Sequence, residues 1–392
     1  MTKRLRRTLA TVALACVAVT GTTGWAAGSA QTAVTGPPPG TAAWRAEGSP
    51  GQRLPDPATA RPERVAAYFA RLDGTERHAL AHRHPLVVGN LDGAPVRLRY
   101  EANRSALRNA LRRARATAED LSRGTEERHK ARSAVRRYAS LLAPGRRILA
   151  FDPRGRGQVA EAYGELSTAR HTAVIVPGSD IDLGTYDRRG PNRYGTPAGM
   201  AQSLHRATEH RAGARTAVVA WTGYTTPVGL GPDAATARLA EAGAPRLARF
   251  LRGLSAADVA APTVLCHSYG SVVCGAAAHT VTAEDAAGLV LFGSPGTGAR
   301  SAAALGTPVP VWAARAEDDW ISHVPGVRLL GLGHGTAPTD PGFGARVLSA
   351  DGARGHTGYL RPGTASLANF ASVTLGSYEA VHCAARGCTD GL

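Results

Sequence analysis

The spacing of apolar residues changes near residue 147 and divides the chain into two parts. Before this point the pattern is helical: from Pro62 large apolar side chains recur at steps of three and four, and residues 103–142 predict long, arginine-rich helices. Beyond it, short apolar runs bounded by turns predict buried strands separated by helices. The runs are ILAFD (148–152), HTAVIVPG (171–178), TAVVAWTGY (216–224), APTVL (261–265), AGLVLFGSPG (287–296) and VPVWAARA (309–316). This alternation favours an α/β fold with a mostly parallel central sheet and helices on both faces.

Three later segments have a helical pattern. In GAPRLARFLRGL (243–254) the large apolar residues fall on one face, and Pro245 is tolerated because it is expected in the first turn. The small residues of SVVCGAAAHT (271–280) predict a second helix. Residues 366–375 predict a last one.

The first residues have the three-part build of a secretory signal peptide. Residues 3–7 hold four basic side chains, residues 9–19 are apolar, and the small residues Gly28 and Ala30 suit cleavage. The apolar stretch is shorter than the roughly 18 residues that a membrane-spanning helix needs. We therefore expect a secreted, extracellular protein that is cleaved near Ala30 and whose mature chain has no transmembrane segment.

The rest of the chain is expected to contain four parts. Residues 31–60 are rich in Pro, Gly, Ala and Thr, and predict a disordered leader. An N-terminal helical segment follows over residues 61–147, with NLDGAP (90–95) as a turn. A catalytic α/β domain is expected over residues 148–382, and a C-terminal tail over residues 383–392.

The chain is strongly basic, with a formal net charge of +16, and Lys3 and Lys130 are its only lysines. Residues 1–30 hold four basic and no acidic side chains, so their removal would leave +12. The densest basic cluster, residues 106–137, interleaves arginine with glutamate and alanine at helical spacing, which favours a solvent-exposed helix face. We expect no nucleic-acid partner and only a weak attraction to acidic polymers of the cell envelope.

Four cysteines remain after the signal peptide: Cys266, Cys274, Cys383 and Cys388. An even number in an oxidising compartment favours disulfides, and four cysteines allow three pairings. We favour Cys383–Cys388 and Cys266–Cys274; a free, buried Cys266 that acts as a small apolar residue is the alternative. No spacing is convincing for zinc, so no metal is expected.

The stretch LCHSYGS, residues 265–271, is the main candidate for chemistry. It is similar to the nucleophile elbow G-x-S-x-G, a sharp strand-to-helix turn that exposes a serine hydroxyl above a sheet. The positions two before and two after the serine need small side chains; Gly270 meets this need and Cys266 nearly meets it. A strand precedes and a small-residue helix follows, so Ser268 is the predicted nucleophile. An ordinary helix-capping serine is the alternative.

A serine hydroxyl needs a base, and the base needs an acid that holds it in the correct tautomer. In an elbow of this kind the chain order is serine, acid, histidine. The acid is expected in EDDWIS, which follows the last predicted strand. Asp319, with Ile321 behind it, fits better than Asp318, which remains the alternative acid.

His356 is the predicted base. It lies in ARGHTGYL, in a loop just before the last predicted helix, where the base of such a triad belongs. His323 is too close to the loop of the acid, and His334 lies among glycines that suggest a turn. His382 is the remaining candidate downstream of the acid.

An oxyanion hole requires two backbone N–H groups. One is expected from Tyr269, directly after the nucleophile, and the other from Ser179, which follows the strand HTAVIVPG. Gly178 would allow the chain to turn there. This chemistry needs no cofactor.

Several motifs together resemble a family of secreted α/β hydrolases that is common in high-GC bacteria and was long filed as an uncharacterised domain. The resemblance covers about residues 62–382, and Cys266 departs from it because the family usually has glycine there. It rests on NLDGAP with EAN (101–103), FDPRGRG (151–157), AVIVPG, VVAWTGY (218–224), HSYGS, LFGSPG (291–296), HG followed by DPGFGA (334–345), and GHTGY. It implies the α/β-hydrolase fold, a preceding helical segment, and a triad of Ser268, Asp319 and His356.

These observations predict a secreted serine hydrolase that acts through an acyl-enzyme on carboxylic esters, either small molecules or lipids. An envelope acyltransferase would use the same residues, with another hydroxyl replacing water. A catalytically inactive fold that binds cell walls is the alternative from a different class of protein.

Overall fold

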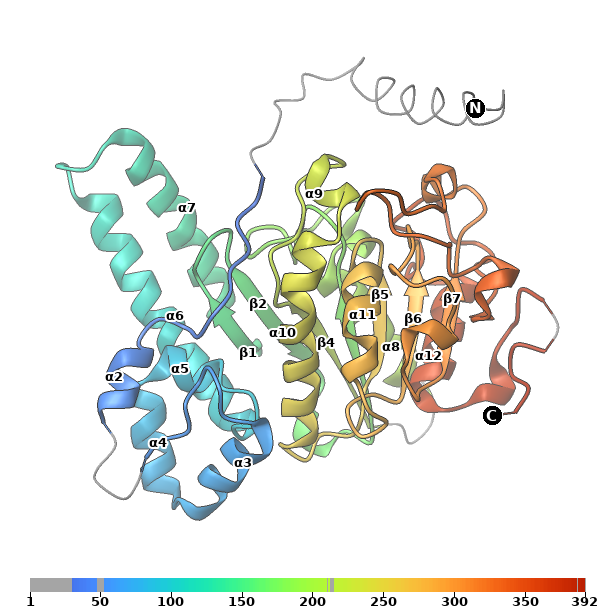
Figure 1. Cartoon of the computed structure of the whole chain (residues 1–392). Coiled ribbons are helices and arrows are strands. Elements are labelled where there is room, and N and C mark those ends of the chain that lie inside the picture. Colours follow the sequence, from blue (N-terminus) through green and yellow to red (C-terminus); the bar gives the residue numbers. More distant parts are fainter. Residues whose placement is uncertain (1–29, 48–52, 210, 212–214, 386, 392) are drawn as a thin grey trace.

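The computed structural model describes residues 30–47, 53–209, 211, 215–385 and 387–391 (Figure 1). In this part of the chain eight strands form one sheet, in the order β1-β2-β4-β3-β5-β6-β7-β8. The pairs β1–β2 and β2–β4 are antiparallel, and every other neighbouring pair is parallel. The strands are β1 (Arg147–Asp152), β2 (Gln158–Tyr163), β3 (His171–Val176), β4 (Thr216–Thr222), β5 (Thr263–His267), β6 (Gly288–Phe292), β7 (Val311–Ala314) and β8 (Arg346–Val347).

Helices cover both faces of the sheet, as expected for strands that are apolar throughout. Alternate residues of β3 show the division: Val174 and Val176 pack under α10 (Arg238–Ser255) and α11 (Gly270–Ala277). Ala173 and Ile175 pack under α8 (Pro197–Glu209) and α12 (Ala365–Leu375) on the other face (Figure 1). The predicted α/β-hydrolase type of architecture, a mostly parallel sheet between two helical layers, is therefore confirmed.

The helix around Pro245 differs from the expectation. It was predicted to begin at residue 243, but α10 begins at Arg238, so Pro245 lies inside the helix and not in its first turn. The helix nevertheless buries a continuous apolar face that includes Leu247, Phe250 and Leu251. Burial of that face offsets the roughly 3 kcal/mol that an interior proline costs.

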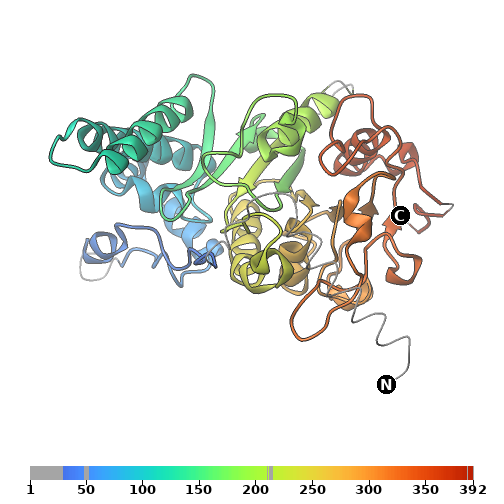
Figure 2. The same ribbon diagram turned by 90° about the horizontal axis from the view of Figure 1, so that it is seen from above.

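The N-terminal helices lie at the β1 end of the sheet, and the C-terminal residues lie at the β8 end (Figures 1 and 2). Two asparagine side chains, a half-buried Asn90 and a fully buried Asn103, join these helices to β1. Asn90 donates to the carbonyl of Phe151 (2.7 Å) and accepts from its N–H (3.0 Å), while Asn103 donates to the carbonyl of Ile148 (3.1 Å). The helices are α2 (Thr41–Ala46), α3 (Pro62–Arg71), α4 (Gly74–Arg83), α5 (Pro85–Gly89), α6 (Val96–Glu119) and α7 (Thr125–Leu141).

The prediction of a disordered leader is wrong for the described residues between 31 and 60. Helix α2 places Trp44 fully buried, and its indole N–H donates to the carbonyl of Pro55 (2.8 Å). Further along the leader, the N–H of Val34 donates to Thr225 Oγ1 (3.0 Å) after β4. The composition of the leader did not predict this ordered structure, because the apolar partners of Trp44 come from helices later in the chain.

The predicted signal peptide covers residues 1–30, and all of it except Ala30 lies outside the described residues. None of the helices formed by the described residues is both long enough and apolar enough to cross a bilayer.

Both favoured disulfides are present. Cys266 at the end of β5 is bonded to Cys274 on α11, with the Cα atoms 6.4 Å apart, and Cys383 is bonded to Cys388 in the tail. The first bond closes a short loop that contains Ser268, and thus ties the strand before the turn to the helix after it. The second lies where Ala384 pairs with Val347 of β8.

We expect the double substitution Cys266→Ala/Cys274→Ala to lower the free energy of unfolding by about 2–3 kcal/mol, because the unfolded chain regains the entropy that the loop closure removes. Urea unfolding monitored by circular dichroism measures this change. The variant Cys383→Ala/Cys388→Ala is the control, and its shorter loop predicts a loss of about 2 kcal/mol or less. An unchanged unfolding free energy for the first variant would contradict this account.

Candidate active site

Ser268 occupies the turn between β5 and α11 and has a φ of 53°, a left-handed conformation that is uncommon for residues other than glycine. Its backbone N–H donates to the carbonyl of Phe292 at the end of β6 (3.0 Å). Among the described residues its hydroxyl has no hydrogen-bond partner, and its side chain is partly exposed. It therefore does not cap α11, and its oxygen is free to react.

Two glycines make room for this turn. A Cβ atom on Gly270 would lie 2.5 Å from the carbonyl oxygen of Val176 and 2.7 Å from that of Pro177, so a larger residue would force the helix away from β3. A Cβ atom on Gly178 would lie 2.6 Å from the Cβ of Ser268. The turn after β3 and the turn after β5 thus touch at the serine.

His356 and Asp319 form a hydrogen-bonded pair. The His356 Nδ1 lies 2.9 Å from Oδ1 and 3.1 Å from Oδ2 of Asp319. An ionised carboxylate only accepts hydrogen bonds, so Nδ1 carries a proton and Nε2 is left as the basic nitrogen. The carboxylate is fully buried, and the imidazole is 14% exposed.

Three donors surround the buried carboxylate. Besides His356, the Tyr359 hydroxyl donates to Oδ2 (2.5 Å) and the N–H of Ile321 donates to Oδ1 (2.9 Å). Burial by itself raises the pKa of Asp319, but the hydrogen bonds from His356, Tyr359 and Ile321 and the charge of His356 outweigh it, so the pKa is lowered. Asp319 is thus held ionised.

His267 and Gly293 connect this pair to the serine turn. His267, directly before Ser268, donates from Nε2 to the backbone carbonyl of His356 (2.7 Å), and the two rings lie 4.7 Å apart. Gly293 follows Phe292, the residue that accepts from Ser268. A Cβ atom on Gly293 would lie 3.2 Å from Asp319 Oδ2 and 3.3 Å from His356 Cε1.

The other candidates for acid and base lie elsewhere. Asp318 is exposed and accepts from the N–H of Gly355 (2.8 Å), so it shapes the histidine loop without contact to the imidazole. His334 is buried against the ring of Tyr269 and donates to the carbonyl of Ala234 (2.7 Å). His323 is exposed, and His382 lines a separate cavity.

The two N–H groups expected to form an oxyanion hole are both without an acceptor in the described part of the chain. Tyr269 is fixed by its hydroxyl, which donates to the carbonyl of Thr236 (2.7 Å) and accepts from the N–H of Ala240 (3.2 Å). Ser179 directly follows Gly178, which touches Ser268.

The loop after β3 is held by an arginine from the turn between β1 and β2. Arg156 pairs with Asp182 (2.8 Å) and donates to the carbonyl of Thr226 (3.2 Å) in the loop after β4. Asp180, at a φ of 65°, donates from its N–H to the carbonyl of Pro227 (2.8 Å). The loops after β3 and β4 are therefore connected next to Ser179.

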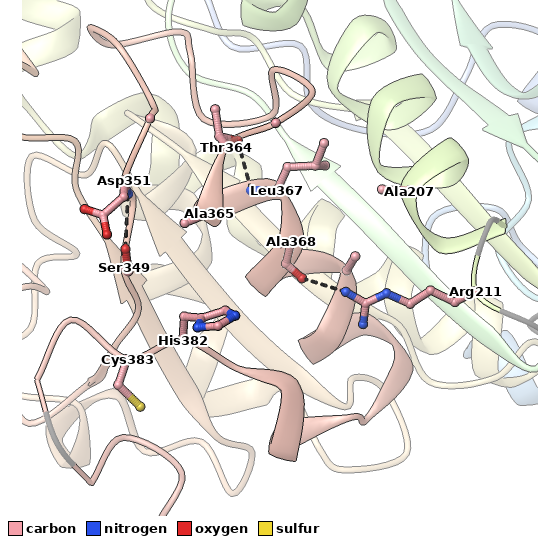
Figure 3. A pocket seen from close by; sticks show the side chains of 13 residues that line it. Ala207, Arg211, Ser349, Asp351, Thr364, Ala365, Leu367, Ala368, His382 and Cys383 are labelled. Carbon is pink, nitrogen blue, oxygen red and sulfur yellow. Dashed lines mark hydrogen bonds between the residues drawn. The ribbon is translucent and has the colours of Figure 1, made fainter.

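A cavity of about 800 Å³ lies away from Ser268, between α12, the end of α8 and the segment around Ser349 (Figure 3). Arg211 reaches across it to the carbonyl of Ala368 and the hydroxyl of Ser372. None of the predicted triad residues lines it. In the described part of the chain no three His, Cys, Asp or Glu side chains are grouped so that they could hold a metal ion.

Sequence reasoning missed two residues of the site, His267 and Tyr359. Both stand in motifs that carry the family resemblance, one position before Ser268 and three positions after His356. The sequence did offer one indication: a titratable or hydroxyl-bearing side chain lies within three residues of each of these two candidate catalytic residues. Their partners, the carbonyl of His356 and the carboxylate of Asp319, are distant in sequence and were not visible.

Comparison with known proteins identifies the fold. Residues 152–329 match a family model described as "Alpha/beta hydrolase". Two uncharacterized proteins from two strains of Mycobacterium tuberculosis are each 31% identical over 391 residues, an alignment that covers 84% of this chain. This chain spans 58% of the length of these relatives. Together with the sheet order, the family match confirms the expected α/β-hydrolase fold and the resemblance to relatives of uncharacterised function.

Two solved structures are also similar to this chain. The 2,6-dihydroxy-pseudo-oxynicotine hydrolase has a TM-score of 0.36 and 14% identity, and the match covers 80% of this chain and 89% of that one. A predicted CIB-like hydrolase from Thermoplasma acidophilum has a TM-score of 0.32 and 12% identity, with coverage of 60% and 97%.

Acid should destabilise the protein partly through His267. Burial and the neighbouring His356 lower the pKa of His267 to about 3, so the folded protein keeps it neutral while the unfolded chain binds a proton below about pH 6.5. Stability from this residue is therefore complete above about pH 6.5 and is lost as the pH falls toward 3. At pH 4.5 the loss is about 2–3 kcal/mol.

The substitution His267→Gln removes the titrating group and keeps a donor toward the His356 carbonyl. Urea unfolding at pH 7.5 and pH 4.5 should show that the variant loses about 2–3 kcal/mol less than the wild type on acidification. Equal losses in the two proteins would mean that His267 does not resist protonation.

Proposed function

We propose that this protein, whose residues 152–329 match an α/β-hydrolase family model, is a serine hydrolase that cleaves carboxylic esters through an acyl-enzyme. The observation that carries the proposal is the hydrogen-bonded pair of His356 and Asp319 beside a serine on a strained turn. Ser268 is the nucleophile, His356 the general base and acid, and Asp319 the group that orients the imidazole.

In the first half of the reaction, Ser268 Oγ attacks the ester carbonyl while its proton passes to His356 Nε2. The carbonyl oxygen becomes an oxyanion, which the N–H groups of Tyr269 and Ser179 bind. The tetrahedral intermediate then breaks its bond to the alcohol oxygen, which takes the proton from His356 and leaves. The acyl group remains on Ser268.

In the second half, water attacks the acyl-enzyme and gives its proton to His356. Collapse of the second intermediate breaks the Ser268 ester bond, and His356 returns the proton to Ser268 Oγ. The carboxylic acid is released and the enzyme is regenerated. Every proton in this cycle is carried by one imidazole, which agrees with the fixed tautomer that Asp319 imposes.

We further propose that the protein is exported, with a signal peptide cleaved near Ala30. The two disulfides support this, because disulfides persist in oxidising compartments. Export would place a basic mature chain near acidic envelope polymers, to which a weak attraction is expected.

The substitution Ser268→Ala should abolish labelling by a fluorophosphonate probe and lower kcat on nitrophenyl esters by about 10⁶-fold, because no other oxygen takes over the acyl group. Gel fluorescence and a chain-length series of esters measure the two effects. Ser133→Ala, on α7, is the matched control and should keep both activities. Labelling that survives in Ser268→Ala would exclude this nucleophile, and a wild type that is never labelled would favour an inactive binding module.

The two neighbouring aspartates provide a second test. Asp319→Asn should lower kcat by about 10⁴-fold, since an amide can stabilise the wrong tautomer of His356 and carries no charge. Asp318→Asn should lower kcat less than about 10-fold, because it weakens only the bond to the Gly355 N–H. Steady-state kinetics on one soluble ester compares them, and the reverse order of effects would make Asp318 the acid.

A further inference from the structure

In the described part of the chain, most of the exposed large apolar side chains lie around the candidate active site. The described residues expose eight of them, and seven lie on the loop after β4 and on the segment 320–332. Val228 and Leu230 belong to the loop, Trp320 follows Asp319, and the other four lie on a hairpin at residues 327–332. We call these seven residues the apolar rim. The eighth, Leu121, lies between α6 and α7.

Each part of the rim is connected to the serine turn. On the loop after β4, the N–H of Gly229 donates to Asp180 Oδ1 (2.8 Å), next to Ser179. The hairpin is anchored by a bridge between Leu332 and Thr236, whose carbonyl binds the Tyr269 hydroxyl. The ring of Trp320 lies 4.7 Å from that of His356 and is 39% exposed. Three separate elements therefore connect the rim to the site.

The backbone conformation and the exposure of Leu330, at the tip of the hairpin, are both unfavourable for the stability of the folded chain. Leu329 and Leu332 exchange both backbone hydrogen bonds, so Leu330 and Gly331 form a two-residue turn, and both have positive φ, 52° and 81°. Such turns prefer Asn-Gly, and a bulky residue at positive φ is strained. Leu330 is also 95% exposed. A strained and exposed leucine at this place indicates a surface contact outside the folded chain.

The charge of the rim restricts what it can contact. Residues 225–232 carry no charged side chain, and residues 320–338 carry one arginine, Arg328, and no acid. The chain as a whole has a net charge of +16. An apolar surface with neutral or anionic groups at its border is complementary to such a rim, as at the boundary between lipid acyl chains and head groups.

We propose that the apolar rim docks the protein on a lipid–water interface, so that the ester enters the site from the lipid phase. This inference rests on the proposed function for its ester substrate, but the docking itself does not depend on catalysis. Leu330 enters the acyl region, Arg328 lies at the head groups, and Trp320 lies where the lipid surface meets His356.

The test measures vesicle binding by sedimentation, with the catalytically inert Ser268→Ala protein as the parent. This parent should bind to vesicles of phosphatidylcholine mixed with phosphatidylglycerol. Its affinity for them should be about 5-fold higher than for vesicles of phosphatidylcholine alone. Adding Leu330→Asn should weaken binding about 10-fold, because a fully inserted leucine is lost. Asparagine tolerates positive φ, so this change should not lower the unfolding free energy. Val228→Ser, on the facing loop, should weaken binding about 3-fold or more.

Leu121→Asn is the matched control, because it replaces another highly exposed leucine (81%, against 95% for Leu330) far from the rim, and it should leave binding unchanged. The apolar residues 9–19 would also bind lipid where they are retained, so the difference between variants carries the test. Unchanged binding in Leu330→Asn, or equal losses in Leu121→Asn, would overturn the proposal. Self-association of the parent that is lost in Leu330→Asn, without vesicle binding, would assign the rim to a second copy and also overturn it.

Kinetics separates this inference from the proposed function. With an active Ser268, the ratio of activity on vesicle-embedded esters to activity on soluble esters should fall about 10-fold in Leu330→Asn and stay constant in Leu121→Asn. A constant ratio in both variants, with normal turnover of soluble esters, would reject docking and leave the serine hydrolase standing. If the protein binds vesicles through Leu330 but has no esterase activity, the docking proposal stands and the serine hydrolase proposal is rejected.

Discussion

The sharp turn from β5 to α11 is the constraint on which the rest of the site depends. One residue, Ser268, must reverse the chain at positive φ, and it can do so only because the neighbouring turn presents Gly178 and the helix begins with Gly270. The N–H of Ser268 is anchored on β6, and the Cys266–Cys274 bond fixes the strand to the helix. A cysteine at the position of the first glycine is thus compatible with the turn, because its side chain is fully buried in the core and bonded to α11.

A second constraint is a buried cluster of polar groups behind the serine. Asp319 is fully buried, and a buried carboxylate is tolerated only when donors satisfy it. His356 and Tyr359 supply two of these donors, and Tyr359 itself accepts from the N–H of Ala316 near the end of β7. Because His267 also holds the backbone of His356, the imidazole is fixed from two directions. Removal of one member would leave several others unsatisfied, so the cluster acts as a unit.

The sequence could predict those features that depend on short segments. Six of the eight strands were visible as apolar runs, but β2 and the two-residue β8 were not. The β2 sequence QVAEAY carries the buried Glu161, which is balanced by Arg146 (2.5 Å). The order of the leader depends on contacts such as Val34 with Thr225, nearly 200 residues away, which no local pattern reports. In the site, Asp318 and Asp319 are adjacent in sequence and equal in chemistry. The position of Ile321 favoured Asp319, but the structure was needed to show that Asp319 is buried against His356 while Asp318 is exposed.

Backbone strain in this molecule is concentrated where the site is. Among the described residues four other than glycine have positive φ, and three of them, Asp180, Ser268 and Leu330, lie on connected loops around the serine. The sheet beneath carries no such residue and is buried on both faces, so the strained loops rest on a rigid support. Strain at Asp180 and Ser268 is explained by the turns that bring Ser179 and the nucleophile together. The hairpin turn explains the positive φ of Leu330, but it does not explain why a leucine that is 95% exposed stands there, which is why its function has to be sought at the surface.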